Sequence, residues 1–291
     1  MTDLARQDFR LIHRLRVRWA EVDLQRIVFN PHYLMYIDTA FTEYWRALAV
    51  PYEAIPKLLG GDLYVKKSSL EYHGSARLDD LLDIGLKCTR IGNSSMIFLS
   101  GIFRGDALLV AGELVYVFAD PVAQTSKTVP AALRELMLSY EAGAAPTDVR
   151  LGSWAEAAAQ ASLLRREVFV DELQLPLGLE YDATDLTAVH ALVRNRFGQL
   201  LATGRLSQEG LGVSRIARVA VNRAMRGAGF GRAAVDALVQ HAAQRGDHKV
   251  VLCSQRSAES FYLSLGFTPL GQAFDQAGAP HIDMGRALVA L

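Results

Sequence analysis

Apolar and polar residues alternate along the chain after residue 60, in the pattern of strands that bury one face and expose the other. The clearest predicted strands cover residues 82–88 and 96–102, and residues 107–119 are apolar nearly throughout, as in a central strand. Gly-Asn at 92–93 and Arg-Gly-Asp at 104–106 lie between these segments and suit hairpin turns. This pattern predicts an antiparallel sheet in the first half of the chain.

A long helical pattern precedes the predicted sheet, from Pro31 to about Leu48. Pro31 suits the first turn of a helix, because its missing N–H would have no partner there. The apolar residues at helical spacing, and those that widen their side of the helix, are Leu34, Ile37, Phe41, Tyr44 and Leu48, with Tyr33, Tyr36, Ala40 and Trp45. A helix that is apolar on so many sides is expected to be wrapped by the sheet, which gives an α+β layer architecture.

The second half of the chain alternates between helical and strand-like segments. In order, we predict a helix at 153–170, two strands within 188–207, a strand at 214–221, a helix at 229–245, a strand at 249–254, a helix at 257–265 and a final strand pair. The consecutive strands and helices from 214 to 265 imply a βαβ connection with at least one parallel pair of strands. We therefore expect an α/β domain after the α+β domain.

The length of 291 residues corresponds to about two domains. The segment EAGAAPTD at 141–148 has no large apolar side chain, so it cannot bury enough surface to offset its ordering entropy. We predict domains at 1–141 and 150–291, joined by a linker at 142–149. Hydrophobic residues make up 51% of the chain, which is enough for a core in each domain.

Composition narrows the classes of function. Lys+Arg and Asp+Glu both number 31, which argues against a nucleic-acid partner, because domains that bind polyanions usually carry a basic excess. No apolar run approaches the ~18 residues of a membrane span, and the charged opening segment lacks the apolar core of a signal peptide. Cys88 and Cys253 are too few and too far apart for a disulfide framework or a zinc site. We expect a cytoplasmic protein that holds no metal.

A candidate carboxylate stands shortly before the predicted helix. The spacing D-x4-V-F-x-P-x-Y is formed by Asp23, Val28, Phe29, Pro31 and Tyr33. Together with the order strand, motif, long helix and antiparallel strands, it resembles the hotdog-fold acyl-CoA thioesterases of the 4-hydroxybenzoyl-CoA and YbgC-like type. The resemblance covers roughly residues 10–140 and implies an α+β hotdog domain that takes acyl-CoA as its substrate.

The thioesterase resemblance assigns roles to two residues. Asp23 takes the place of the catalytic carboxylate, either as the nucleophile or as the general base for water, and the backbone N–H of Asn30 takes the place of the oxyanion contact. A free N–H at the start of a helix suits a developing negative oxygen. Arg26 stands where relatives usually have Gly, and it either alters the turn that presents Asp23 or adds a cation near the CoA. Asn30 stands where relatives often have His or an aromatic residue.

A second candidate site is a glycine-rich loop between a predicted strand and a predicted helix. The loop reads R-x-x-G-x-G from Arg226 to Gly231. Glycines let the backbone approach a ligand closely, and the N-terminus of a helix offers unpaired N–H groups to a phosphate. A dinucleotide-binding fingerprint is disfavoured because no acidic residue ends the next strand, and a Walker A loop is excluded because Gly-Lys-Ser/Thr is missing.

The loop resembles the pyrophosphate loop of GCN5-related N-acetyltransferases (GNAT), and the segment SAESFYLSLGF that contains Tyr262 resembles the second signature of that family. The resemblance covers about residues 150–288, and Gln255 in place of the usual Asn, with GAPHIDM at 278–284, resembles the ElaA-like branch. It implies that Tyr262 protonates the departing CoA thiolate. The acetyl-CoA contacts that it implies are Val219, Ala220 and Val221 along the pantetheine arm, and Arg226, Gly227, Ala228, Gly229, Phe230, Gly231 and Arg232 at the pyrophosphate.

The general base of such an acetyltransferase stays open at this stage. Glu180, Asp182, Asp185 and His190 cluster in the sequence, yet an acidic loop is more often simply solvated. His32 and His73 lack the spacing of metal ligands and receive no role.

Both halves point to CoA thioesters, so we expect a bifunctional enzyme: an acyl-CoA thioesterase fused to an acetyl-CoA-dependent N-acetyltransferase that acts on an amine acceptor. The alternative is a CoA-thioester-binding or scaffolding protein in which one domain is inactive. Hotdog domains of this type build each active site across a subunit interface. The resemblance therefore also implies a homodimer or homotetramer, joined through residues 10–140.

Overall fold

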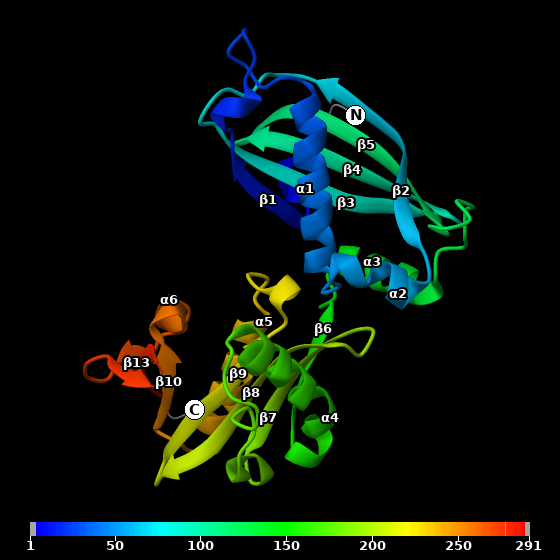
Figure 1. The fold of residues 1–291 in the computed structure, drawn as a ribbon. Coiled ribbons are helices and arrows are strands. Elements are labelled where there is room, and N and C mark those ends of the chain that lie inside the picture. Colours follow the sequence, from blue (N-terminus) through cyan, green and yellow to red (C-terminus); the bar gives the residue numbers. More distant parts are fainter. Residues whose placement is uncertain (1–3, 277, 289–291) are drawn as a thin grey trace. The chain divides into compact units, whose positions relative to one another are not determined.

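A computed structural model of the protein describes residues 4–276 and 278–288, and the chain separates into two units at the boundary between Pro146 and Thr147 (Figure 1). Each unit has its own sheet. Within the described residues, no helix is both long enough and apolar enough to cross a membrane.

The N-terminal unit is built on a five-stranded antiparallel sheet with the spatial order β1-β3-β4-β5-β2. Its strands are β1 (Leu11–Arg16), β2 (Asp62–Tyr72), β3 (Leu81–Ile91), β4 (Ser95–Arg104) and β5 (Ala107–Ala119). The predicted antiparallel sheet and both predicted hairpin turns are confirmed, because β3, β4 and β5 pair consecutively. The alternation of the sequence becomes a buried face, so that Leu82, Ile84 and Phe98 are fully buried.

Helix α1 (Pro31–Ala47) lies across one face of this sheet (Figure 1). Its apolar side is buried, and Phe41 stacks on Tyr116 of β5 with ring centroids 4.1 Å apart. The predicted helix wrapped by a sheet is therefore confirmed. The unit also contains the short helix α2 (Ile55–Leu59) and α3 (Ala131–Glu141). Helix α3 is absent from the sequence prediction, although Leu133, Leu136, Met137 and Tyr140 show the buried helical spacing that would have indicated it.

The C-terminal unit is built on a mixed sheet with the order β11-β13-β10-β9-β8-β7-β6, and β12 pairs with β13. Its strands are β6 (Thr147–Gly152), β7 (Val189–Asn195), β8 (Leu200–Gly210), β9 (Val213–Val221), β10 (Lys249–Gln255), β11 (Thr268–Pro269), β12 (Phe274–Gln276) and β13 (Ala279–Ala287). Strands β9 and β10 are parallel, which confirms the predicted βαβ connection. Residues 147–149, which the sequence analysis places in the linker, instead belong to β6 and pair with β7.

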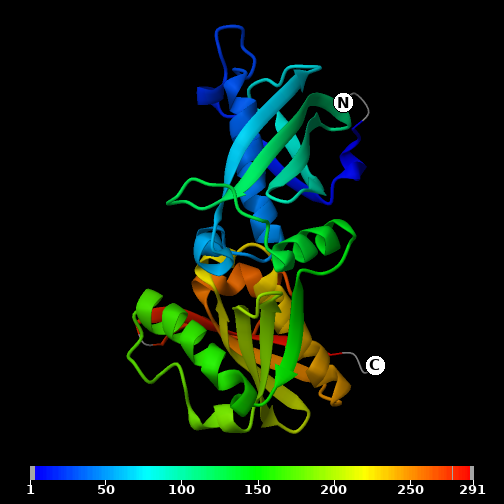
Figure 2. The same cartoon turned by 90° about the vertical axis from the view of Figure 1, so that its right-hand side faces the viewer.

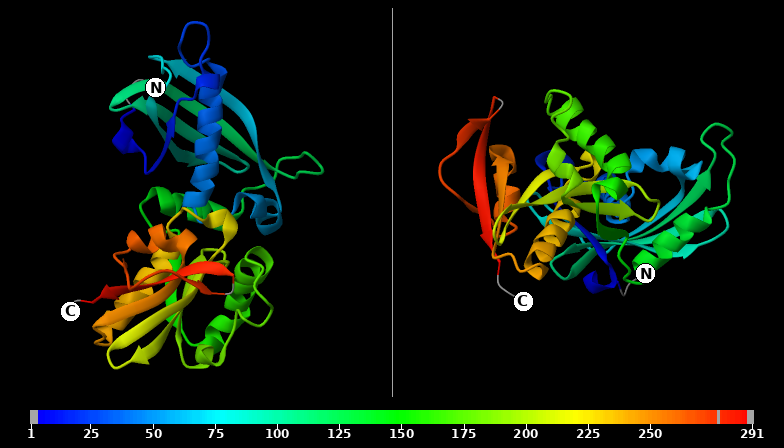
Figure 3. Two further views of the ribbon diagram at one scale, coloured as in Figure 1. Left: turned by 60° about the vertical axis from the view of Figure 1, so that its left-hand side comes forward. Right: turned by 90° about the horizontal axis from the view of Figure 1, so that it is seen from below.

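Two helices cover opposite faces of this sheet (Figures 2 and 3). They are α4 (Trp154–Arg165) and α5 (Phe230–Gln244), and both contact β7, β8 and β9. The predicted helix at 153–170 is α-helical only to Arg165, and its continuation at Arg166–Glu172 is π-helical. The short helix α6 (Glu259–Leu263) follows a single 3-10 turn at Arg256–Ala258, in the region where one helix was predicted at 257–265.

The centre of the C-terminal sheet is irregular where β9 and β10 stop pairing with each other. The parallel pairing joins only residues 213–215 of β9 to residues 249–251 of β10. Farther along, the register of β8 against β9 shifts between Thr203 and Arg205, and Arg218 has a positive φ of 53°. A bulge of this kind bends the strand that carries it. The later residues of β9 and β10 therefore face each other without pairing, and candidate ligand-binding residues lie there.

Candidate active sites

The first candidate site is a tight turn that precedes α1. The backbone N–H of Asp23 donates to the carbonyl oxygen of Ile27, and the carbonyl oxygen of Asp23 accepts the N–H of Arg26. The Asp23 carboxylate accepts the N–H of Gln25 at 2.8 Å. Arg26 has a left-handed φ of 63°, which is a conformation that glycine adopts without steric cost. The Gly that is common here in thioesterases therefore serves the turn, and Arg26 forms the same type of turn at a conformational cost. The Arg26 side chain is exposed.

Glu21 anchors this turn to α1, and the sequence analysis overlooked it. Its side chain is buried, and its carboxylate accepts the hydroxyl of Tyr36 at 2.7 Å and the Nε–H of Arg18 at 2.6 Å. Its backbone C=O accepts the N–H of Phe29 at 2.9 Å. Burial acts to raise the pKa of Glu21, but the hydrogen bonds from Arg18 and Tyr36 outweigh burial and hold the pKa below its usual value. Glu21 ends the 3-10 turn Trp19–Glu21 and is the one buried residue in it, and burial of this kind is not visible in the sequence.

The structure places Asn30 immediately before α1, so its backbone N–H belongs to the unpaired N-terminal turn of that helix. Pro31 has no N–H, and the N–H groups of His32 and Tyr33 are bonded to Phe29 and Asn30. Within the described residues, the N–H of Asn30 has no hydrogen-bond partner. A donor that is free and lies at the positive end of a helix is suited to an oxyanion.

Several apolar side chains near this turn in the sequence are exposed to solvent in the described chain. Trp19 is 80% exposed, Leu24 is fully exposed, and Phe29 and Met35 are each about half exposed. Such a group of exposed apolar residues beside a carboxylate marks a surface that a ligand or another protein surface covers.

The second candidate site begins at the glycine-rich loop. Gly227 and Gly229 have left-handed φ values of 82° and 89°, and a Cβ at either position would meet no atom within 4 Å. Their conformation requires glycine, and the space in front of them is open. At Gly231, by contrast, a Cβ would approach Val221 to 3.0 Å, so glycine there allows α5 to pack closely on β9.

The N-terminus of α5 presents a row of free donors. Among the described residues, the N–H groups from Gly227 to Arg232 have no acceptor, and the first bond into the helix runs from Ala233 to Gly229 at 3.0 Å. Six consecutive unpaired N–H groups at a positive helix end form a ready site for a diphosphate. Arg226 is held beside them by a bidentate ion pair with Glu172, at 2.6 and 2.7 Å.

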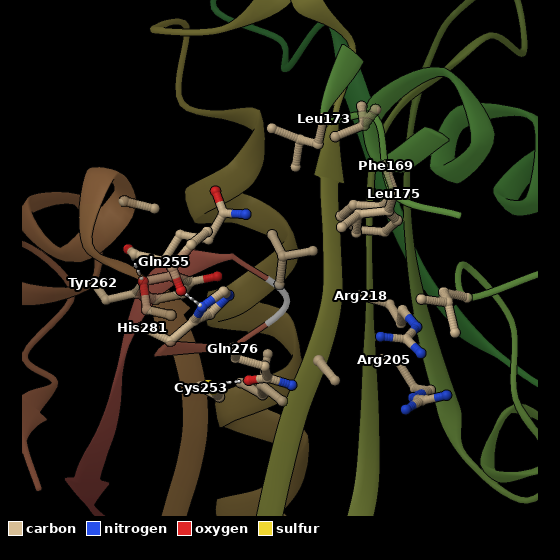
Figure 4. A pocket seen from close by; sticks show the side chains of 18 of the residues that line it. Phe169, Leu173, Leu175, Arg205, Arg218, Cys253, Gln255, Tyr262, Gln276 and His281 are labelled. Carbon is tan, nitrogen blue, oxygen red and sulfur yellow. Dashed lines mark hydrogen bonds between the residues drawn. The ribbon is translucent and has the colours of Figure 1, made fainter. Parts of the chain in front are cut away.

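Two cavities meet beside this loop. One, of about 620 Å³, is lined by the glycine-rich loop together with Val219, Val221 and Tyr262. The other, of about 720 Å³, is lined by residues of β9, β10 and β13 and also by Val219 and Tyr262 (Figure 4). Tyr262 therefore lies where the two cavities join. Burial raises the pKa of its hydroxyl to about 12, which keeps it protonated.

His281 lines the second cavity, and the sequence analysis did not single it out. In the register of β13 against β10 it lies opposite Gln255, and Figure 4 shows both on the same wall as Tyr262. Its Nδ1 lies 2.8 Å from the carbonyl oxygen of Ala279. A carbonyl only accepts, so Nδ1 carries a proton, and in the neutral ring the lone pair is therefore on Nε2.

The acidic and histidine residues that the sequence analysis left open as bases serve other purposes. Asp185 and His190 are fully buried, and Asp185 pairs with Arg165 at 2.7 Å. Asp182 pairs with Arg205 at 2.7 Å. These three residues belong to a structural ion cluster, whereas Glu180 bonds the backbone of its own loop. Within the described residues, no group of His, Cys, Asp or Glu side chains is arranged to hold a metal ion.

Comparisons with known proteins match each unit to a family. The model of the thioesterase superfamily matches residues 25–117, and the model of the acetyltransferase (GNAT) domain matches residues 180–288. The acyl-CoA thioester hydrolase YbgC of Escherichia coli O157:H7 is 27% identical over 117 residues, which are 40% of this chain and 87% of that protein.

Relatives of the C-terminal unit are more similar. A UPF0039 protein of Schizosaccharomyces pombe is 36% identical over 124 residues, which cover 42% of this chain and 82% of that protein. Protein ElaA of Escherichia coli K12 is 31% identical over 130 residues, which cover 43% of this chain and 84% of ElaA. Each relative thus spans only one of the two units.

Proposed function

Because this chain joins a thioesterase-superfamily hotdog domain to an ElaA-like GNAT acetyltransferase domain, we propose that it is a bifunctional enzyme of CoA thioesters. The N-terminal domain hydrolyses an acyl-CoA, and the C-terminal domain transfers an acetyl group from acetyl-CoA to an amine. The observation that carries the proposal is the pair of free-donor sites: the Asn30 N–H at the start of α1, after the turn that holds Asp23, and the six N–H groups from Gly227 to Arg232.

In the proposed hydrolysis, the thioester oxygen accepts the N–H of Asn30 while Asp23 acts at the carbonyl carbon. Asp23 either attacks this carbon itself or takes a proton from the water that attacks it. With water as the nucleophile, Asp23 takes the water proton, the C–O bond forms as the C–S bond breaks, and the proton passes to the departing sulfur of CoA. With Asp23 as the nucleophile, the same exchange gives an acyl-aspartyl anhydride and the CoA thiolate. Water then cleaves this anhydride, which releases the acid and the Asp23 carboxylate, and the proton set free goes to the thiolate. The donor is most effective when it faces the oxygen whose charge grows in the transition state. Glu21 acts as a positioning residue that holds this turn against α1.

In the proposed acetyl transfer, the six N–H groups hold the pyrophosphate of acetyl-CoA, and the unpaired edge of β9 at 219–221 runs along the pantetheine arm. The acetyl carbon then lies near Tyr262, where the two cavities join. The acceptor amine enters through the second cavity and attacks this carbon directly, and the C–S bond breaks as the C–N bond forms. Tyr262 donates its hydroxyl proton toward the departing sulfur.

His281 is proposed as the group that removes a proton from the acceptor. An amine attacks only after its ammonium form has lost a proton, so a base facing the same cavity is required. The Nε2 lone pair of His281 meets this need, because Nδ1 is committed to Ala279. This role replaces the open assignment among Glu180, Asp182, Asp185 and His190.

Thiol release from a panel of acyl-CoAs, with and without amine acceptors, tests both activities on the full chain. Asp23→Asn should lower release without an amine by at least ~100-fold, the low end for loss of a positioned acid–base group. Gly229→Glu should abolish amine-dependent release and weaken binding of acetyl-CoA in calorimetry, because it puts a bulky negative group where the pyrophosphate binds. Neither substitution should affect the other activity.

Two matched variants control for general damage. Asp106→Asn removes an exposed carboxylate from the β4–β5 turn, and Gly271→Glu places the same side chain at an exposed glycine with a φ of 94° and no atom near a Cβ. Both variants should keep the two activities of the parent protein. Gly271→Glu puts a side chain on a left-handed residue just as Gly229→Glu does, so it also controls for that backbone strain. Acyl-CoA hydrolysis that survives Asp23→Asn would remove the assignment of that carboxylate. Full binding of CoA thioesters with no turnover in one domain would instead support a binding or scaffolding role for that domain.

A further inference from the structure

A cluster of five charged side chains, three of them buried and two partly exposed, adjoins the second cavity of the C-terminal unit. The guanidiniums belong to Arg165, Arg205 and Arg218, and the carboxylates belong to Asp182 and Asp185. Arg205 bridges both carboxylates at 2.7 and 3.0 Å, and Arg218 reaches Asp182 at 2.9 Å. Each guanidinium has a carboxylate partner, but three cations share two anions, so among the described residues one positive charge of the cluster is not matched by a negative one.

The remaining titratable group of the cluster, His190, does not change this balance. Its Nδ1 lies 3.1 Å from Nη2 of Arg165, which can only donate, and its Nε2 lies 3.0 Å from the carbonyl oxygen of Asp185, which can only accept. This arrangement requires the neutral ring with its proton on Nε2. The surplus positive charge therefore belongs to the guanidiniums.

Two of these guanidiniums line the cavity. Figure 4 shows Arg205 and Arg218 next to each other on the wall opposite Tyr262 and His281. The side chain of Arg205 is only 7% exposed, and the Nε–H groups of Arg205 and Arg218 are both buried without a hydrogen-bond partner in the described chain. The carboxylates of Asp182 and Asp185 are not among the described residues that line the cavity. The cavity wall therefore presents cations of the cluster and not its carboxylates.

A third guanidinium in the same wall, that of Arg215, is already compensated. It makes a bidentate ion pair with Glu209 at 2.7 Å, and Asp283 of β13 adds a further negative charge nearby. The unmatched charge thus belongs to the cluster of Arg165, Arg205 and Arg218, of which only Arg205 and Arg218 line the cavity, and Arg215 does not add to it. The same cavity is apolar next to these two residues, where Phe169, Leu173 and Leu175 line it (Figure 4).

From this arrangement we propose that the acceptor is a small amine that also carries a carboxylate and an apolar substituent, as in an apolar α-amino acid. The inference rests on the proposed acetyltransferase function. The carboxylate binds the guanidiniums of Arg218 and Arg205, the apolar substituent lies against Phe169 and Leu175, and the amine is directed to the junction at Tyr262. A carboxylate accepts paired guanidinium N–H groups in fork geometry, which fixes the orientation of the amine as well as its affinity.

The parent protein provides the first test, in which acetyl-CoA is the donor and two series of three acceptors are compared, each with an amino acid, its amide and its decarboxylated amine. The compounds are leucine with leucinamide and 3-methylbutylamine, and phenylalanine with phenylalaninamide and phenethylamine. We expect kcat/KM for each acid to exceed that of its amide and of its decarboxylated amine by at least about tenfold, the equivalent of the weaker charge-assisted hydrogen bonds. Equal or higher kcat/KM for the amides overturns the inference, even if the amines are acetylated.

The second test compares Arg218→Met with Arg215→Met. Arg218→Met keeps a long side chain but removes the unmatched charge, so the preference for the acid over the amide should fall to within about threefold. Arg215→Met removes a compensated guanidinium from the same wall, and the preference should stay as in the parent protein. Because the readout is a ratio measured on one sample, partial loss of folded protein cancels. A preference that survives Arg218→Met refutes the proposed contact.

The outcomes separate this inference from the function on which it rests. If acetyl-CoA binds and no compound in either series releases CoA above the rate without acceptor, the acetyltransferase proposal fails together with the inference. If the decarboxylated amines are acetylated at least as well as the acids, acetyl transfer stands and only the acceptor class proposed here is wrong.

Discussion

Tyr262 illustrates how burial sets the chemistry of a single side chain. The ring is only 9% exposed, and the raised pKa of about 12 keeps the hydroxyl protonated at neutral pH. Because an ordinary thiol has a pKa of about 8.5, complete proton transfer to a free thiolate in water would be unfavourable. A thiolate formed in the same buried junction also loses solvation, so its pKa rises as well. In the proposed acetyl transfer, we therefore expect the hydroxyl to act while the C–S bond breaks, when negative charge accumulates on sulfur.

Removing that hydroxyl should affect turnover without affecting binding. For Tyr262→Phe we expect kcat of acetyl transfer to fall by ~100-fold, at the lower end for a general acid. The affinity for acetyl-CoA should stay within a few-fold, because the lost contact strengthens only in the transition state. Steady-state thiol release and calorimetric titration with acetyl-CoA measure the two quantities. A comparable loss of affinity would assign the hydroxyl to ground-state binding.

His190 should make the stability of the C-terminal unit depend on pH. Burial and the nearby Arg165 lower the pKa of His190 below the ordinary 6.5, although its contacts with Asp185 oppose the shift. The unfolded chain therefore binds this proton at a higher pH than the folded chain does. The stabilisation is complete above pH 6.5 and is lost as the pH falls through the lowered pKa of the folded state.

Hydrogen exchange of β7 peptides between about pH 7 and pH 5, corrected for the intrinsic exchange rate, measures this effect. The opening free energy should decrease toward pH 5 with a slope of up to about 1.4 kcal/mol per pH unit. His190→Gln retains an acceptor and a donor but does not titrate, so its slope in this range should be much smaller. Equal slopes for the two proteins would show that another group is responsible.

At the scale of elements, the site turns depend on conformations that most side chains avoid. Gly227 and Gly229 supply the left-handed residues that lead into α5, and Arg218 provides one at the bulge of β9. The turn after Asp23 requires the same conformation, but here the residue is Arg26. These positions place free N–H groups and guanidiniums where neither a regular strand nor a regular helix would put them.

A matched pair of substitutions isolates the conformational cost at Arg26. Arg26→Gly and Arg26→Ala both remove the guanidinium, but only glycine adopts a φ of 63° without strain. We expect the Gly variant to be more stable than the Ala variant by about 1 kcal/mol. Chemical denaturation, followed by pulsed hydrogen exchange of α1 peptides, measures the difference. If the two variants unfold at the same denaturant concentration, the left-handed conformation of the turn is not retained in solution.

At the scale of the whole molecule, the exposed apolar residues around Asp23 lead to a prediction about assembly. Trp19, Leu24 and Phe29 are exposed in the single chain, and β2 is an edge strand of its sheet. Together with the thioesterase resemblance, this predicts a homodimer or a homotetramer joined through the N-terminal unit. Light scattering of the full chain should give an even number of subunits. A monomer that still hydrolyses acyl-CoA would contradict this prediction.

The pattern of residues along the chain was sufficient to predict those helices, strands and motifs that are formed by residues close together in the sequence. Apolar residues recur at every second position in residues 82–88, because in a strand residues two positions apart face the same side. After Pro31 they recur at every third or fourth position, because in a helix residues at that spacing share one face. Both patterns therefore indicate directly which side is buried. The spacing from Asp23 to Tyr33 and the glycine-rich loop were sufficient to recognise both families, because each motif lies in one continuous segment.

Tertiary structure alone decided what comes together from distant segments. Arg218 lies at a bulge of β9, and this bulge is visible only in the pairing of β9 with β8. Arg165, Asp185 and Arg205 belong to three separate elements and form ion pairs only in the folded chain. The free Nε2 of His281 depends on the carbonyl oxygen of Ala279 and on the register of β13 against β10. Charge balance and burial arise from such long-range pairing. For that reason the sequence predicted the two acyl-CoA sites, whereas the unmatched guanidiniums opposite Tyr262 became visible only in the folded chain.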